Sequence, residues 1–162
     1  MVIVLMGVSG SGKTTIGQLL AQRLSWTFYD GDDFHPPANV EKMRNGIPLT
    51  DADRESWLTA LQQLLDSLLQ NGRSAVLACS ALKQSYRARL QRHSEEVRFV
   101  YLKGDYDLIR QRLTTRHGHF MPADLLRSQF ATLEEPQEVF TIDVAKSPEV
   151  IINTIIAALQ LG

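Results

Sequence analysis

The most informative segment of the chain is Gly7-Val8-Ser9-Gly10-Ser11-Gly12-Lys13-Thr14. It matches the pattern G-x-x-x-x-G-K-[ST] at every fixed position. A β-branched run, Val2–Leu5, precedes it, and apolar residues at helical spacing follow from Thr14 to Leu24. A glycine-rich turn between a strand and a helix directs successive backbone N–H groups inward, which creates an anion site at the helix N-terminus. The sequence therefore predicts a phosphate-binding loop.

The same loop indicates a nucleotide cofactor. Lys13 can reach the β- and γ-phosphates, and the Thr14 hydroxyl can ligate Mg²⁺. The glycines do not follow the G-x-G-x-x-G spacing, which argues against a nicotinamide site. We therefore expect ATP and Mg²⁺ as cofactors, with nucleotide contacts from Gly7, Val8, Ser9, Gly10, Ser11, Gly12, Lys13, Thr14 and Thr15.

Length and composition indicate one domain, residues 1–162. The 17 basic and 18 acidic residues give a net charge of -1, which disfavours a nucleic-acid-coating protein. The single Cys79 excludes an internal disulfide, as is common in a reducing compartment. The apolar start, Met1–Met6, is too short for a membrane span or a signal-peptide core. We expect a cytoplasmic protein with no membrane or nucleic-acid partner.

Apolar runs alternate with helical patterns along the chain. We expect strands at Val2–Leu5, Thr27–Tyr29, Ala75–Cys79, Val97–Leu102 and Val139–Val144. We expect helices at Thr14–Leu24, Asp51–Gln70, Gln84–Gln91 and Tyr106–Arg116, a short one opened by Pro122, and a final one capped by Ser147. Thr50 is the expected N-cap of the long helix, and Asn71-Gly72 its stop. The alternation predicts an α/β fold with a mainly parallel sheet.

Three aspartates, Asp30, Asp32 and Asp33, follow the second expected strand. In an open parallel sheet, ligands bind outside the carboxyl ends of the strands, so these side chains belong on the side of the phosphate loop. One can contact Mg²⁺, and another can accept a proton from a substrate hydroxyl. The alternative is an aspartate-rich turn with a helix cap. No Asn-Lys-x-Asp stretch that would read guanine is present, which disfavours a GTPase switch.

Further stretches extend the pattern across nearly the whole chain. They are 30–36 (DGDDFHP), 39–49 (NVEKMRNGIPL), 51–58 (DADRESWL), 79–83 (CSALK) with Tyr86-Arg87, 101–105 (YLKGD), 116–120 (RHGHF) and 128–136 (SQFATLEEP). Together with the loop they resemble the gluconokinase family, the small P-loop kinases of the thermoresistant gluconate kinase type. The resemblance implies ATP-dependent phosphorylation of D-gluconate to 6-phosphogluconate. It also implies a homodimer and a three-layer, nucleoside-monophosphate-kinase-like fold. In that fold five parallel strands are ordered 2-3-1-4-5 beneath a short helical lid at about residues 112–133.

Gluconate carries one carboxylate and several hydroxyls, so its site needs a cation and hydrogen-bonding groups. Within the family-like stretches the candidate cations are Arg54, Lys83 and Arg87. A surface pair with Asp51 or Glu55 is the alternative for Arg54. His35 either contacts a substrate hydroxyl or helps position Asp32, or else it orders its turn as a structural histidine.

The stretch 116–120 and the residues just before it imply the contacts of the lid. By resemblance, Arg112 stacks on adenine opposite Pro148, Arg116 reaches the transferring phosphoryl group, and His119 contacts the substrate or the lid. Arg112 and Arg116 lie four residues apart and therefore on one helix face, which can instead be a solvated face. His117 and His119 lack a third metal ligand nearby. Outside the site, we expect Trp57 in the core and Cys79 as a buried residue rather than a nucleophile.

The predicted mechanism gives each group one role. Thr14 and Asp30 hold Mg²⁺, Asp32 deprotonates the terminal hydroxyl, and Lys13 and Arg116 stabilise charge on the transferring group. Residues 73–133 carry 11 basic and 5 acidic groups, so this basic third of the chain can attract both anionic substrates. The alternatives are a kinase for another small hydroxy acid, such as shikimate, and a nucleotide-dependent switch.

Overall fold

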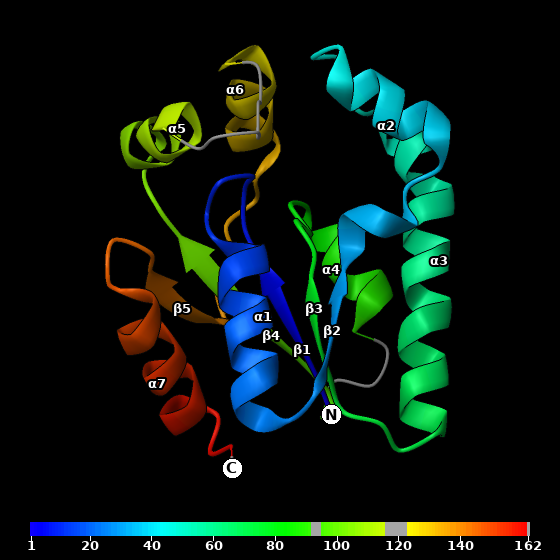
Figure 1. Cartoon of the computed structure of the whole chain (residues 1–162). Coiled ribbons are helices and arrows are strands. Elements are labelled where there is room, and N and C mark those ends of the chain that lie inside the picture. The colour runs from blue at the N-terminus through cyan, green and yellow to red at the C-terminus, as the bar shows by residue number, and fades with distance from the viewer. Residues whose placement is uncertain (92–94, 116–122, 162) are drawn as a thin grey trace.

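The computed structural model describes residues 1–91, 95–115 and 123–161. Its sheet is formed by β1 (Val2–Met6), β2 (Thr27–Asp30), β3 (Ala75–Ala78), β4 (Val97–Lys103) and β5 (Phe140–Asp143). All neighbours pair in parallel, in the order β2-β3-β1-β4-β5. The expected order 2-3-1-4-5 is therefore confirmed (Figure 1).

The helices are α1 (Lys13–Leu24), α2 (Pro37–Arg44), α3 (Asp51–Gln70), α4 (Gln84–Leu90), α5 (Tyr106–Thr115), α6 (Ala123–Thr132) and α7 (Pro148–Ala158), and a 3₁₀ turn, η1, covers Gly31–Phe34. The expected caps of the long helix are present: Thr50 and Asp53 form a capping box, and Asn71 ends the helix. Ser147 caps α7 as expected.

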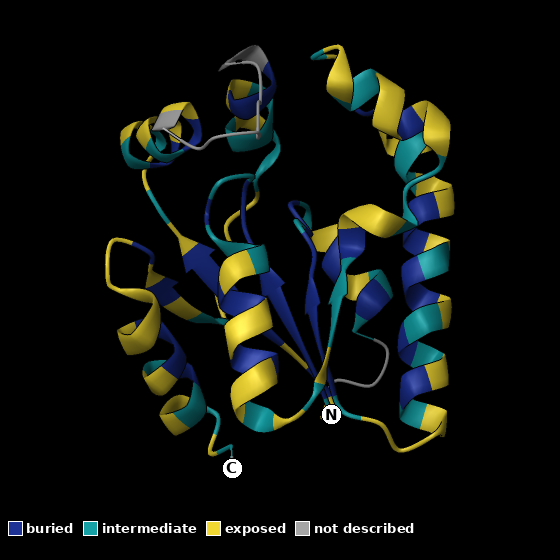
Figure 2. Ribbon diagram, in the orientation of Figure 1, coloured by how far each residue is buried: buried dark blue, intermediate teal, exposed yellow. Residues whose placement is uncertain are grey.

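The central strand β1 divides the core into two layers. Its odd residues Ile3 and Leu5 pack with α1, α5 and α7, whereas its even residues Val2 and Val4 pack with α3 and α4. Side chains alternate between the faces of a strand, so a run that is apolar at every position marks a strand covered on both sides. Figure 2 shows the buried strands between helices whose outer faces are exposed.

The sequence did not predict α2 or η1. The helix α2 has eight residues, begins at the second of two consecutive prolines, and buries only Asn39. It therefore presents no apolar stripe from which a helical period could be detected. This helix matters for the site, because α2 and α6 stand on opposite sides above the carboxyl edge of the sheet (Figure 1).

Candidate active site

The phosphate loop lies between β1 and α1, as predicted. Gly10 and Gly12 adopt positive φ angles of 82° and 97°, and Gly12 is the N-cap of α1. A Cβ on Gly10 would stand 2.8 Å from Leu113 Cγ, so a side chain is excluded there by both conformation and space. The loop therefore curls tightly against α5 and opens at the N-terminus of α1.

Lys13 lies across this loop. Its Nζ donates to the carbonyl oxygens of Gly7 at 2.8 Å and Val8 at 2.9 Å. Burial lowers the pKa of Lys13, while the negative charges of Asp32 and Asp30 act in the opposite direction. A cavity of about 240 Å³ adjoins the ammonium, and its lining includes Ser9, Gly10, Gly12, Lys13, Thr14, Asp30, Asp32 and Ala78. Its size and backbone donors suit phosphate groups.

Asp30 and Thr14 meet at the edge of this cavity. The Thr14 hydroxyl donates to Asp30 Oδ2 at 3.3 Å, and Asp30 Oδ1 accepts from the Asp32 backbone N–H at 3.0 Å. The second contact caps η1, so the helix-cap alternative also holds for Asp30. A hydroxyl and a carboxylate oxygen are the hard donors that Mg²⁺ takes when phosphate and water complete its shell. This pair fits the predicted metal site.

A second cavity, of about 600 Å³, continues from the first toward α2 and α3. Both cavities share Ser9, Lys13 and Asp32. The larger one is also lined by charged and polar groups from four elements, namely Asp33, His35, Arg44, Arg54, Ser128 and Gln129. A group bound there lies next to Lys13 and Asp32, at the junction with the phosphate cavity.

His35 and Arg54, two of the predicted substrate contacts, line this larger cavity. The His35 ring stacks on Trp57 with centroids 4.4 Å apart, and burial together with the nearby Arg54 charge lowers its pKa to about 4. Arg54 Nη1 donates to the Tyr86 hydroxyl at 3.1 Å. Sequence reasoning missed Arg44, although it lies inside the stretch 39–49 that carried the family resemblance.

Lys83, by contrast, does not line the cavity. Its ammonium bonds both carboxylate oxygens of Asp51, at 2.9 and 3.1 Å, and the same carboxylate accepts from Tyr86. The bond to Asp51 raises the pKa of Lys83, so the ammonium stays charged. The structure places this predicted substrate contact in an ion pair that joins α3 to the start of α4.

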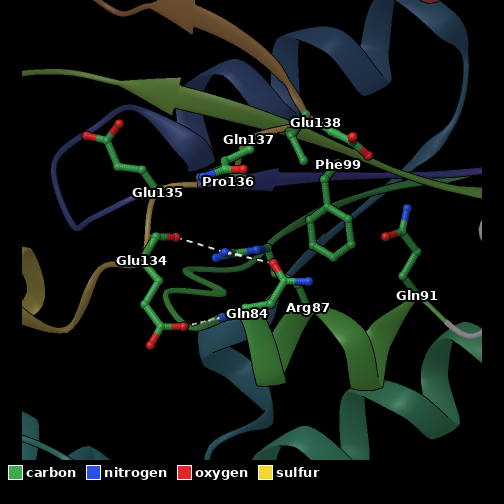
Figure 3. A pocket seen from close by; sticks show the side chains of 10 residues that line it. Gln84, Arg87, Gln91, Phe99, Glu134, Glu135, Pro136, Gln137 and Glu138 are labelled. Carbon is green, nitrogen blue, oxygen red and sulfur yellow. Dashed lines mark hydrogen bonds between the residues drawn. The ribbon is translucent and has the colours of Figure 1, made fainter.

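Arg87 is also outside the substrate cavity. Its side chain is buried, and its guanidinium donates to the carbonyl oxygens of Ala81 at 2.7 Å and Glu134 at 2.8 Å. Figure 3 shows it in a different cavity, between α4 and the segment 134–138. The guanidinium group is planar and has five N–H donors. This geometry suits binding to several backbone carbonyls as well as it suits binding to a carboxylate. In this structure Arg87 therefore holds two loops together, and its predicted contact with the substrate stays a prediction.

Gln129 on α6 is a further site residue that the sequence did not single out. Its Oε1 accepts from the Ser9 backbone N–H at 2.7 Å, and its Nε2 donates to Ser9 Oγ at 3.1 Å. The residue lies in the stretch 128–136 that carried the resemblance, but nothing in its type indicates a contact with the phosphate loop.

The remaining candidates are Arg112, Arg116 and His119, which belong to the predicted lid contacts. Arg112 Nη2 donates to the Val144 carbonyl at 2.6 Å, which brings it to the loop that ends at the exposed Pro148. Arg116 and His119, with His117, lie outside the described residues. Trp57 and Cys79 are buried as expected, and burial raises the pKa of the Cys79 thiol to about 12, so it is no nucleophile.

Within the ranges 1–91, 95–115 and 123–161, no group of three or more His, Cys, Asp or Glu could hold a metal ion. This does not conflict with Thr14 and Asp30, since Mg²⁺ is commonly bound through one or two carboxylates plus phosphates and water. In the described part of the chain no helix is long and apolar enough to cross a membrane.

Comparison with known proteins agrees with this geometry. The family model described as "Shikimate kinase" matches residues 9–160. The chain is 48% identical to the gluconokinase of Gluconobacter oxydans over 161 residues, which cover 98% of this chain and 90% of that protein. It is 40% identical to the thermoresistant gluconokinase of Escherichia coli over 165 residues, which cover 99% and 94% of the two chains.

A solved structure leads to the same group. The crystal structure of a gluconokinase from Sinorhizobium meliloti superposes with a TM-score of 0.88 at 41% identity, covering 98% of this chain and 90% of that one. The identity in these comparisons extends over nearly the whole length of the chain and not over the phosphate loop alone. The chain therefore belongs to the gluconokinase family, within the wider shikimate kinase family whose model it matches.

Proposed function

We propose that this protein transfers the γ-phosphoryl group of ATP to the terminal hydroxyl of D-gluconate and releases 6-phosphogluconate and ADP. The observation that carries the proposal is the pair of adjoining cavities that share Ser9, Lys13 and Asp32. One has the backbone donors of a phosphate site, and the other has the cations and polar groups that a hydroxylated carboxylic acid needs. The named relatives support gluconate as the acceptor.

Each residue has a definite task in this transfer. Asp32 takes the proton of the attacking hydroxyl, whose oxygen forms the new bond to phosphorus as the bond to the β-phosphate oxygen breaks. Lys13 moves from the loop carbonyls to the phosphate oxygens and stabilises the charge that develops on them. Thr14 and Asp30 would hold Mg²⁺, which supplies charge neutralisation on the phosphates when bound.

The acceptor is held by the larger cavity. Arg54 and Arg44 are the arginines on its wall and are suited to the substrate carboxylate, while His35 and Ser128 are suited to hydroxyls. Arg112 stacks on adenine against Pro148. We keep Arg116 and His119 as the phosphoryl and substrate contacts of a lid at about residues 112–133. The whole chain, residues 1–162, acts as one kinase domain.

A phosphotransfer panel tests the proposal. The protein is incubated with Mg-ATP and, separately, gluconate, related sugar acids and shikimate, and products are followed by ³¹P NMR. We expect a phosphate ester only with gluconate. Transfer to shikimate alone would favour the second candidate, which the matching family model suggests, whereas slow ATP hydrolysis with no ester would indicate a nucleotide-dependent switch.

The family resemblance also implies an assembly and the composition a location: we propose that this protein works as a homodimer in the cytoplasm. Light scattering coupled to gel filtration would give the mass of the particle, against 18.2 kDa for one chain. Fractionation of cells with a tagged chain would test its location.

A further inference from the structure

The imidazole of His35 is held in one orientation by its surroundings. Its ring stacks on Trp57 at an interplanar angle of 12°, and Trp57 Nε1 in turn donates to the Gly31 carbonyl at 2.7 Å. The His35 backbone N–H donates to the Asp32 carbonyl at 3.3 Å. The ring plane is therefore fixed relative to η1, the element that carries Asp32.

Asn39 determines which nitrogen of that ring carries the proton. Asn39 Nδ2 donates to the backbone carbonyl of Asp53 at 2.7 Å. A peptide carbonyl can only accept, so it is the amide nitrogen of Asn39, not its oxygen, that faces this side. The same nitrogen lies 3.2 Å from His35 Nδ1. Nδ1 must therefore be the acceptor, which leaves the proton of a neutral ring on Nε2.

The anchor of Asn39 is itself fixed. Asp53 is the third residue of α3, and its carboxylate accepts from the Thr50 backbone N–H at 2.9 Å and from Lys42 Nζ at 2.8 and 3.0 Å. Asn39 is only 3% exposed and lies on α2, the same helix as Lys42. The α2–α3 junction thus holds the Asn39 amide in place from both helices.

The charges around the ring favour its neutral form on balance. Burial and the Arg54 guanidinium lower the pKa of His35 to about 4. The other charged groups that line the cavity are Lys13 from the phosphate loop, Asp32 and Asp33 from η1, and Arg44 from α2. Next to Asn39, Lys42 and Asp53 form an ion pair with each other. The imidazole is accordingly uncharged at neutral pH.

We propose that Asn39 is a positioning residue that fixes His35 as an Nε2–H donor to a hydroxyl of the acceptor substrate. Nε2 points away from Asn39 and has no hydrogen-bond partner among the described residues, while His35 lines the larger cavity. That the acceptor of this hydrogen bond is a hydroxyl of the substrate rests on the proposed function. An Nε2–H group on a neutral ring donates to a lone pair of a substrate oxygen. It remains a donor across the physiological pH range.

The tautomer can be measured without substrate. Long-range ¹H–¹⁵N correlation spectra of the full chain at pH 7 separate protonated from unprotonated ring nitrogens, and loss of signals in His35→Gln assigns the ring among the four histidines. We expect a proton on Nε2 and none on Nδ1. A wild-type ring that carries its proton on Nδ1, or on both nitrogens, would overturn the inference.

Asn39→Asp tests the positioning role with an isosteric change. A carboxylate next to Nδ1 attracts a proton there, so the pKa of His35 rises and the neutral ring takes the Nδ1–H form. The imidazolium still donates from Nε2, but the neutral ring no longer does. We therefore expect KM for gluconate to increase with pH between about 5 and 8 in this variant, around the ordinary pKa of histidine, and to stay flat in the wild type. Parallel profiles in the two proteins would contradict the proposal.

A matched pair at position 35 gives a second, independent readout. The amide nitrogen of Gln can occupy the place of Nε2, whereas the shorter Asn side chain reaches only the place of Nδ1. We expect His35→Asn to raise KM for gluconate about tenfold, the cost of one hydrogen bond left unmade, and His35→Gln to raise it less. KM for ATP should not change in either variant, which also serves as the folding control. Equal losses in the two variants would contradict a donor at Nε2.

The two proposals fail separately. If the wild type phosphorylates no sugar acid, the proposed function is wrong, but the NMR tautomer still decides the role of Asn39. If gluconate is phosphorylated and the ring carries its proton on Nδ1, the function stands and the inference about Asn39 fails.

Discussion

At the scale of single residues, Lys13 illustrates how one side chain depends on the fold around it. Its ammonium is held by the carbonyl oxygens of Gly7 and Val8, close to Asp32 and Asp30. Burial of the charge disfavours the protonated form, which the lowered pKa reflects. Phosphate oxygens that replace the carbonyls would restore full compensation of the charge.

Replacing Lys13 by Met should therefore abolish most turnover and leave the fold intact. We expect kcat to fall by roughly 10²–10³-fold, the loss typical of one group that stabilises transition-state charge. Thermal unfolding should not shift downward, because a buried charge is removed. Steady-state assays with ATP and gluconate measure the first effect and circular dichroism the second. An active, folded Lys13→Met protein would refute the phosphoryl-transfer role.

Asp32 should show the signature of a general base. It lines both cavities, so it can reach a hydroxyl that lies beside the phosphate site. Asp32→Asn should lower kcat by about 10²–10⁴-fold and change KM for ATP much less. Rate measurements over a range of ATP concentrations separate the two constants. An unchanged kcat would remove Asp32 from the chemistry.

At the scale of elements, the junctions between helices and loops carry the site. Asp53 joins α2 to α3 through Lys42 and completes the capping box with Thr50. The bond from Lys42, followed by the bond from Thr50, lowers the pKa of Asp53 from 3.8 to about 2. A carboxylate with a lowered folded-state pKa stabilises the fold above its ordinary pKa, and the contribution is lost as pH falls toward the folded value.

Asp53→Asn tests this linkage. At pH 7 the variant should unfold at a lower temperature than the wild type. The difference should shrink as the pH falls from 3.8 to about 2, where the wild-type carboxylate also loses its charge. Unfolding temperatures measured at a series of pH values give the result. A difference that is constant over this range would mean that the charge of Asp53 contributes nothing.

Arg87 joins α4 to the loop after α6. Replacing it by Met leaves the buried carbonyl of Ala81 and the part-buried carbonyl of Glu134 without this donor, so we expect a loss of about 1–3 kcal/mol in unfolding free energy. The matched control is Arg89→Met on the same helix, whose partner Glu55 is exposed, with an expected change within about 1 kcal/mol. Urea unfolding measures both. If Arg87→Met instead raised KM for gluconate at unchanged stability, the substrate-binding role would be supported.

At the scale of the whole molecule, the phosphate loop and α6 are brought together although Ser9 and Gln129 are 120 positions apart. Ser9 lines both cavities and Gln129 lines the larger one, and α6 stands on the opposite side of the molecule from α2 (Figure 1). The loop N–H groups can serve phosphates only if the loop keeps its shape. Gln129 is therefore placed to hold the loop and to link it to the lid side of the molecule.

Gln129→Ala should lower kcat/KM for ATP about tenfold, the cost of losing the partner of the part-buried Ser9 N–H. Gln129→Glu keeps an acceptor for Ser9 but brings a negative charge toward the phosphates, so it should raise KM for ATP further. Ala131 is an exposed residue on the same helix, so Ala131→Ser is the control and should behave as the wild type. Steady-state kinetics at varied ATP measure all three. Wild-type constants in Gln129→Ala would show that the contact is dispensable.

The phosphate loop, both faces of β1 and the caps at Thr50 and Ser147 could be predicted from the amino-acid sequence, because local patterns fix turns, strands and helix ends. The strand order was predicted from the family resemblance. The use of polar side chains whose partners are far along the chain became visible only in the folded molecule. The fold assigned Arg87 to backbone carbonyls, Lys83 to an ion pair, and Asn39 and Gln129 to the site. The reason is physical: a polar side chain can serve a substrate or the protein itself, and what the folded chain places within hydrogen-bond distance decides between them.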